Sequence, residues 1–171
     1  YEVRNRDIKD KEMALYWYTK SANQGSVKAQ VRLGIMYMKG KGVRKNDEEA
    51  FKWWMKAAES DSALAQMMVG ESFEFGTGIS QNQKAAFKWY KLASAQGMAQ
   101  AQFSLASMYG RGQGVLTDYV RGYMWYDLSK YNGRKGSEKF RDLISEYMTK
   151  AQVFKAQELA RRCLASTYVD C

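Results

Sequence analysis

The sequence predicts an all-α solenoid of repeated helix pairs. Three observations predict it: motifs recur every 36 residues without a gap, apolar residues within each copy follow helical spacing, and a glycine pair separates the two helical stretches of each copy. Such an array buries one continuous core between stacked units. We therefore expect a single solenoid over residues 1–171, with about three and a half repeats and a C-terminal capping helix.

Three sets of matching residues define the period. Each full copy opens with an Ala-Gln pair, reaches a Gly-x-Gly turn followed by Val or Ile eleven residues later, and continues with Trp-Trp or Trp-Tyr. A half copy over residues 12–28 precedes them, because Trp17 lies one period before Trp53. We expect full repeats at residues 29–64, 65–100 and 101–136, and a cap at 137–171. The markers in the three copies are Ala29, Ala65 and Ala101; Gly40, Gly76 and Gly112; and Trp53, Trp89 and Trp125.

In the first full copy, one helix is expected near residues 29–39 and a second near 47–59. The glycine loop ends the first helix, because glycine tolerates the positive φ that closes a helix C-terminus. Asn46 or Asp47 is placed to cap the second helix. Large Trp and Tyr side chains are expected to pack against small residues on the facing helix. The inward positions are Ala29, Leu33, Gly34, Tyr37, Ala50, Trp53, Trp54 and Ala57, and the outward ones include Lys52 and Lys56.

After the third copy the pattern fades. Gly122 and Lys130 replace alanines of the earlier copies, and Asn132-Gly133 suggests a turn. Residues 137–166 are predicted to form terminal helical structure that caps the solenoid. One side of this segment carries Phe140, Leu143, Ile144, Tyr147 and Met148.

The charge balance favours an acidic partner. The chain has a net charge of +9 and no histidine, and long-range attraction then favours acidic or anionic surfaces. Nucleic acid is not expected, because the aromatic residues between the lysines belong to the packing pattern and cannot stack on bases. No apolar run is long enough to insert in a membrane. The chain starts with Tyr1, so we expect a processed or trimmed chain, and the lack of a signal peptide proves nothing.

The residues needed for several enzyme classes are missing. Without histidine there is no Ser-His-Asp arrangement and no imidazole ligand for a metal, and we expect no cofactor. Glu71 and Glu74 lie one helical turn apart, as a general acid and base would, but acids on a helix surface are usually solvated. The Gly-x-Gly pairs follow helices rather than strands and are turns, not phosphate loops. We therefore predict a protein that is not an enzyme.

The combined motifs resemble a known family. With A-Q-x-x-L-G-x-x-Y, G-x-G-V and A-x-x-W-Y-x-x-A-A in register over about residues 12–136, the chain resembles the Sel-one-like repeat (SLR) family, relatives of the tetratricopeptide repeats. The resemblance implies a right-handed superhelix of antiparallel helix pairs. It also implies a non-enzymatic scaffold that binds a partner protein on its concave face, with toxin-neutralising, immunity-type proteins of the bacterial envelope among the family's roles.

The two cysteines follow the same resemblance. The tail around Cys163 and Cys171 is similar to the ending of secreted bacterial members, in which paired cysteines fold the last segment back. This implies a disulfide and a periplasmic or secreted protein, since disulfides persist in oxidising compartments. Two unrelated thiols remain the alternative. A zinc site would need two further ligands, and none is expected.

Partner specificity is assigned to positions that vary between copies. Apolar residues on an otherwise open face of the first helices suggest contact with another protein. The alternative is that these residues pack against the neighbouring unit. Two other functions stay open, a structural envelope component that self-associates through its end faces and, less favoured, a hydrolase of cell-wall or antibiotic-like substrates. The predicted partner-binding residues are Val31, Ile35, Lys39, Met67, Glu71, Phe75, Phe103, Ser107 and Arg111.

Overall fold

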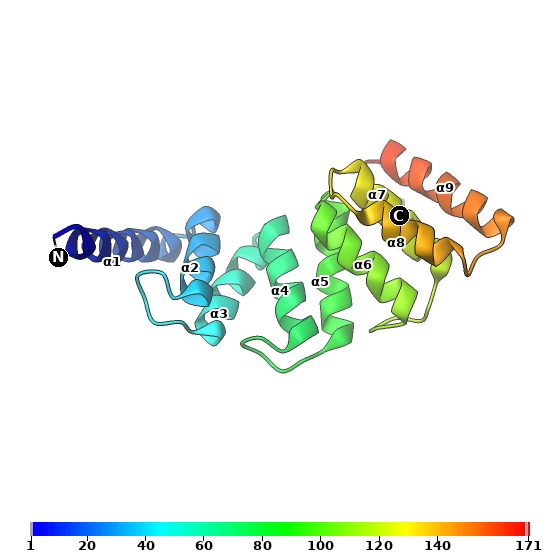
Figure 1. The fold of residues 1–171 in the computed structure, drawn as a ribbon. Coiled ribbons are helices and arrows are strands. Elements are labelled where there is room, and N and C mark those ends of the chain that lie inside the picture. The colour runs from blue at the N-terminus through cyan, green and yellow to red at the C-terminus, as the bar shows by residue number, and fades with distance from the viewer. Residues whose placement is uncertain (1, 170) are drawn as a thin grey trace. The chain divides into compact units, whose positions relative to one another are not determined.

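The structure, a computed structural model, describes residues 2–169 and 171, with the side chains of residues 10, 12–169 and 171. The described part of the chain is helical and contains no strand, which confirms the predicted α-α class. Figure 1 shows its helices. They are α1 (Glu2–Asn23), α2 (Val27–Lys39), α3 (Asp47–Glu59), α4 (Ala63–Phe75), α5 (Gln83–Ala95), α6 (Ala99–Arg111), α7 (Tyr119–Tyr131), α8 (Ser137–Ser145) and α9 (Lys150–Ala165).

Two compact units divide the chain, residues 1–81 and residues 82–171. The first, called unit 1, holds α1 to α4, and the second, called unit 2, holds α5 to α9. Each is described by itself below. Within the described residues, no helix combines the length and the apolar character needed to cross a bilayer.

Local signals set the helix ends. The predicted second helix of the first copy has the observed bounds, and its first helix begins two residues earlier than expected, at Val27. Asn46 caps α3 by accepting a hydrogen bond from the Glu49 N–H, and Asn82 and Asp118 cap α5 and α7 one and two periods later. Gly40 ends α2 with a left-handed φ of 63°, as the glycine loop predicted.

The second glycine of the Gly-x-Gly loop allows close packing between repeats. In unit 1 a Cβ atom at Gly78 would collide with the backbone of Asp47, at the start of α3. In unit 2, Gly114 lies in the same way against the backbone of Gln83, at the start of α5. These two loops therefore pack directly onto the preceding repeat, which only a residue without a side chain permits.

The core follows the predicted rule of large against small. A Cβ at Gly34 would collide with the Trp54 indole, so the missing side chain makes room for the ring. Tyr90 and Tyr126 occupy the position of Trp54 in the next copies and are also buried. Lys52 and Lys56 are exposed, as predicted.

The glutamine of each Ala-Gln pair joins successive helix pairs. Its side-chain amide donates to a carbonyl in the last turns of the preceding second helix, eight residues earlier. The three bonds are Gln30 Nε2 to Ala22 O at 3.3 Å, Gln66 Nε2 to Ala58 O at 3.4 Å, and Gln102 Nε2 to Ser94 O at 3.1 Å. Because these side chains are buried, the bonds satisfy polar groups that would otherwise be costly to bury.

Helix α1 takes the place of the predicted half repeat but is longer, because it starts at Glu2 rather than near residue 12. Ala22 of α1 forms a buried cluster with Ala29 and Leu33 of α2, and Leu15 of α1 and Trp53 of α3 pack against this cluster. The other side of α1 is open, and its N-terminal part projects away from α2 (Figure 1). Among the described side chains of α1, the exposed large apolar ones are Met13, Tyr16, Trp17 and Tyr18.

The predicted terminal helical structure consists of two helices, α8 and α9, and both contact α7. Thr149 separates them and begins α9 with a capping box, in which it exchanges hydrogen bonds with Gln152. The chain then turns back through Thr167 and Tyr168, whose φ values of 53° and 68° lie in the left-handed region.

A disulfide between Cys163 and Cys171 closes this turn, which confirms the predicted pairing. The returning segment places the Tyr168 hydroxyl 2.9 Å from Asn132 Oδ1, to which it donates. Asn132 Nδ2 in turn donates to Gln102 Oε1 at 2.9 Å. The tail is therefore tied by hydrogen bonds to the glutamine that joins α5 and α6.

Candidate partner-binding surface

The nine predicted partner-binding residues lie along the first helices α2, α4 and α6. Their exposure rises along each helix. The first residue of each set is buried or half-buried, the second is half-buried, and the third is exposed. In this order the sets are Val31, Ile35 and Lys39; Met67, Glu71 and Phe75; and Phe103, Ser107 and Arg111.

In unit 1, two of these residues line a hollow of about 370 Å³. Val31 and Ile35 form part of its apolar surface, together with Leu64 at the start of α4. Lys28 and Arg32 add basic groups to it. Met67 is only 7% exposed and packs in the core, whereas Phe75 is 70% exposed at the end of α4.

In unit 2, Ser107 and Arg111 line a second hollow, of about 360 Å³, which we call the aromatic pocket. It lies among α6, α7 and α8 and includes the beginning of the α8–α9 connection. Its lining residues are Ser107, Gly110, Arg111, Tyr119, Tyr126, Phe140, Leu143, Ile144 and Tyr147.

Two glycines let α8 approach α6 and α7 at this pocket. A Cβ at Gly122 would lie 2.7 Å from the Ile144 Cδ1 atom, and a Cβ at Gly110 would lie 3.1 Å from the same atom. In the earlier copies an alanine stands at the position of Gly122. Ile144 therefore occupies the space that the alanine side chain would fill. The fading of the repeat pattern at Gly122 is thus an adaptation to the cap.

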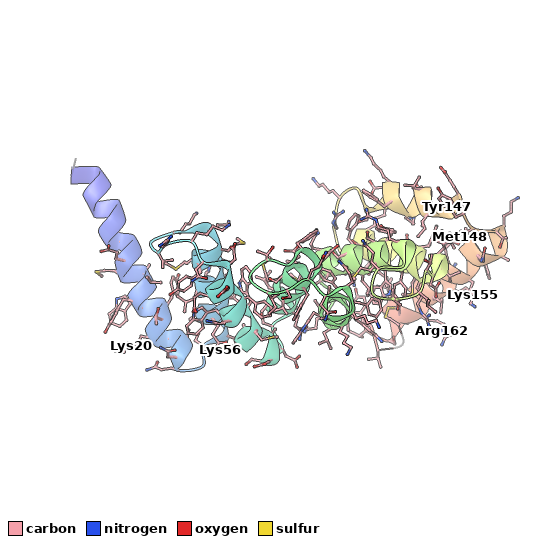
Figure 2. All side chains as sticks on the ribbon, turned by 90° about the horizontal axis from the view of Figure 1, so that it is seen from below. Lys20, Lys56, Tyr147, Met148, Lys155 and Arg162 are labelled. Carbon is pink, nitrogen blue, oxygen red and sulfur yellow. A yellow bond between two sulfur atoms is a disulfide. The ribbon has the colours of Figure 1, made fainter. Side chains whose placement is uncertain are left out.

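Aromatic pairs form the walls. Tyr126 and Phe140 stack with ring centroids 5.9 Å apart, and Tyr119 and Tyr147 stack at 5.6 Å. Phe103 meets the Phe140 ring edge to face at 4.9 Å, so this predicted site residue supports the wall from behind. Phe140, Leu143 and Tyr147 nevertheless remain 42%, 54% and 66% exposed. Tyr147 and Met148 lie where α8 gives way to α9 (Figure 2).

The polar groups of the pocket are few. Burial raises the pKa of the Tyr126 phenol, although its hydrogen bond with Ser107 and the charges of Arg111 and Arg134 act in the opposite direction. The other arginines nearby are engaged, since Arg134 lies over the Phe103 ring and Arg141 pairs with Asp127 at 2.7 Å. Arg111 is exposed and forms no ion pair with any residue whose side chain the structure describes.

Of the residues predicted to bind a partner, Ser107 and Arg111 line the pocket and Phe103 packs behind its wall, whereas Tyr119 and Tyr126 were not predicted as site residues. Tyr126 was assigned to the packing signature, which it also serves, and Tyr119 carries no repeat signal. The apolar side of the terminal segment, from Phe140 to Tyr147, was noticed and interpreted as cap packing. The overlooked signal is that four aromatic residues, Tyr119, Tyr126, Phe140 and Tyr147, lie on α7 and this segment, where the repeat packing ends.

The acidic pair considered for catalysis lies on α4. Burial is the main cause of the raised pKa of the Glu71 carboxyl, and the charge of Glu74 adds to it. A carboxyl that is half-buried in a helix surface needs no catalytic role to show such a shift. No group of metal-binding side chains occurs among the described residues.

Comparison with known proteins identifies the repeat. The sequence model of the Sel1 repeat matches residues 7–26, 27–62, 63–98 and 99–133, which is most of the chain. The chain belongs to the Sel1 repeat family. Sel1 repeats generally act as non-catalytic scaffolds for protein–protein interaction. Among curated proteins, none is similar enough in sequence to count as a match.

Solved structures of Sel1 repeat proteins resemble the chain. One is c5321, a protective antigen of uropathogenic Escherichia coli with an SLR fold, at a TM-score of 0.82 and 28% identity over 90% of this chain and 34% of c5321. A Sel1 repeat protein from Oxalobacter formigenes has a TM-score of 0.72 and 34% identity over 78% of this chain and 54% of that protein. The chain therefore spans about a third and about half of these two proteins.

A third structure shares the fold alone. Cysteine rich protein B of Helicobacter pylori has a TM-score of 0.62 at 16% identity, over 78% of this chain and 96% of that protein. The similarity to this protein supports the helix-pair fold class only.

Proposed function

We propose that this Sel1 repeat chain is a scaffold that binds a partner protein through the open ends of its first helices. The observation that carries the proposal is the aromatic pocket, whose lining combines exposed rings with a cationic group that has no ion-pair partner among the described side chains. Exposed apolar groups of this kind are typical of binding surfaces. The proposed contact residues are Val31, Ile35, Lys39, Met67, Glu71, Phe75, Phe103, Ser107 and Arg111.

The structure refines how these nine residues would act. Phe75, Lys39 and Arg111 are exposed and would touch the partner directly, whereas Met67 and Phe103 would hold the surface in place from below. The basic charge of the chain favours an acidic partner surface. The disulfide supports an oxidising location, and we include the periplasm or the exterior of a bacterium in the proposal. The most specific form of the proposal is that the chain binds and neutralises a toxin.

Affinity capture from a native lysate tests the scaffold role. The bait is compared with a Phe75→Asp, Tyr147→Asp double variant, which alters only exposed side chains. A Leu92→Asp, Tyr131→Asp variant is the matched control, because these side chains are 49% and 71% exposed and line neither hollow. We expect one stoichiometric protein to be lost from the first variant and kept by the control. Equal capture by both variants would remove the surface assignment.

A second candidate function is self-association through the open side of α1. Tyr16 and Trp17 are 59% and 56% exposed there, as large side chains at an interface between copies would be. This candidate corresponds to a structural component of the envelope. Analytical ultracentrifugation over a hundredfold range of concentration distinguishes it. A rise in mass that a Tyr16→Glu, Trp17→Glu variant abolishes would support self-association, and a constant mass would reject it.

A further inference from the structure

The chemistry of the aromatic pocket indicates which part of a partner it would hold. At about 360 Å³ the pocket lies near the lower end of the roughly 300–1,000 Å³ that small-molecule sites occupy. This size suits one large side chain and the peptide that flanks it. Ile144 closes the floor, and the stacked pairs Tyr126–Phe140 and Tyr119–Tyr147 supply ring faces and edges. An apolar side chain entering the pocket would meet the surface that aromatic rings prefer.

One charge is available beside this apolar surface. Arg111 lies in the last turn of α6 and is the only charged residue among those that line the pocket, since no acidic residue belongs to the lining. A guanidinium presents a planar array of N–H donors that matches a carboxylate. Arg134 and Arg141 do not compete for an incoming acid, because Arg134 donates to Gln100 and Arg141 to Asp127 and Asp142.

Resting on the proposed scaffold function, we propose that the aromatic pocket binds a partner segment in which a large apolar residue stands next to an aspartate or glutamate. The apolar side chain enters among the rings of Phe140 and Tyr147, and the acidic side chain pairs with Arg111. Tyr119 lines the same pocket, and its hydroxyl would offer a second donor to the segment. The pocket therefore selects a two-residue pattern, which is a more specific requirement than general acidity.

A peptide array tests this pattern with the full-length chain. The probes are acetylated and amidated hexapeptides that carry every pair of amino acids at two adjacent central positions within a glycine-serine frame. The blocked ends remove terminal charges, so any carboxylate that binds belongs to a side chain. We expect pairs of Trp, Phe, Leu or Met with Asp or Glu to give the strongest signals. Replacing the acid by its amide should weaken binding about fivefold to tenfold.

Variants assign the signal to the pocket. Arg111→Gln removes the cation from an exposed position, and Leu143→Asp places a like charge in the path of the acid, so each should abolish the preference for acidic pairs. Lys130→Gln is the matched control, because it removes one positive charge from an exposed position in unit 2 outside the pocket. Arg111→Glu should shift the preference from acidic to basic neighbours. Circular dichroism melts check that every variant is folded.

Three results would overturn the proposal. They are an array with no preferred pair, a preference that Arg111→Gln leaves unchanged, and a preference for apolar pairs without an acid. Vesicles of phosphatidylglycerol and phosphatidylcholine provide a further arm. Binding to these vesicles that needs Arg111, without any preferred peptide pair, would assign the pocket to a membrane surface instead. If capture of a protein survives in Arg111→Gln while the array shows no preference, the scaffold function stands and only the pocket chemistry fails.

Discussion

Trp17 in unit 1 and Trp125 in unit 2 occupy the same position of the repeat, three periods apart, yet their surroundings differ. Trp17 is 56% exposed on the open side of α1, whereas Trp125 is 2% exposed on α7, which α6, α8 and α9 contact. The amino acid and its repeat position are the same. The signature aromatic residues are therefore buried only where a neighbouring helix covers them.

The largest expected effect comes from truncating these two tryptophans. Trp125→Ala would leave a cavity in unit 2 and should lower the free energy of unfolding by about 3–5 kcal/mol. Trp17→Ala removes mainly exposed surface and a contact with the Lys20 ammonium, 5.4 Å from the ring centroid, and should change the free energy by less than about 1 kcal/mol. Urea unfolding followed by circular dichroism measures both. Equal losses would show that α1 is covered in solution.

The disulfide provides the next comparison, because only unit 2 contains one. A Cys163→Ala, Cys171→Ala variant should be less stable by about 2 kcal/mol, since the short closed loop no longer restricts the unfolded chain. Reduction with dithiothreitol should lower the unfolding midpoint of the native chain in the same way and leave the variant unaffected. A native chain that is insensitive to the reductant would contradict a stabilising role of the pair.

The buried glutamines also differ between the two units. Gln102 in unit 2 uses both ends of its amide, because it donates to Ser94 O and accepts from Asn132. Gln30 in unit 1 donates to Ala22 O, but its buried Oε1 atom has no hydrogen-bond partner among the residues that the structure describes. We expect Gln102→Ala to lower the free energy of unfolding by about 2 kcal/mol and Gln30→Ala by about 1 kcal/mol. If urea unfolding showed a larger loss for Gln30→Ala than for Gln102→Ala, this explanation of the glutamine bonds would be wrong.

The smallest effect concerns Glu71 in unit 1, whose counterpart in unit 2 is the neutral Ser107. Burial raises the pKa of the Glu71 carboxyl above its ordinary value of 4.5, so the folded state disfavours the ionised form. The stability linked to this group is therefore fully present below pH 4.5 and is lost as the pH rises through the raised pKa. Glu71→Gln should be more stable than the native chain at pH 7, by roughly 0.5 kcal/mol at most, and the advantage should vanish near pH 4.

Thermal melts of both chains at several pH values check this prediction. A Ser107→Ala variant serves as the comparison in unit 2, because its stability difference from the native chain should not change over the same pH range. A constant advantage of Glu71→Gln at every pH would show that the charge of this carboxyl is not its cause.

The helix bounds were predictable because their signals are local. Asn46 and the Gly40 turn lie within one copy, and their repetition confirmed each assignment. The extension of α1 before residue 12 was missed, since residues 2–11 carry mostly charged residues and little apolar period. The break at Thr149 was missed as well, because a capping box within a long amphipathic segment resembles ordinary helix sequence.

The aromatic pocket was only partly predictable for a different reason. Ser107 and Arg111 stood out because they vary between copies, but the partners of a pocket come from distant positions. Ile144 lies 22 residues beyond Gly122, outside the period, so no repeat comparison could pair the two. The role of Gln102 could not be predicted for a different reason. A glutamine recurs at this position in each copy, so it marks the period but does not indicate what its side chain binds.

The recurring glutamine bond also affects how such a chain can change in length. The three bonds use the same donor, the same acceptor position and the same spacing of eight residues. A duplication or deletion of one whole 36-residue segment would keep this bond between successive helix pairs, whereas an insertion between the carbonyl residue and the glutamine would separate the two. Gene rearrangements in multiples of 108 nucleotides would therefore change the length of the array without disturbing this bond.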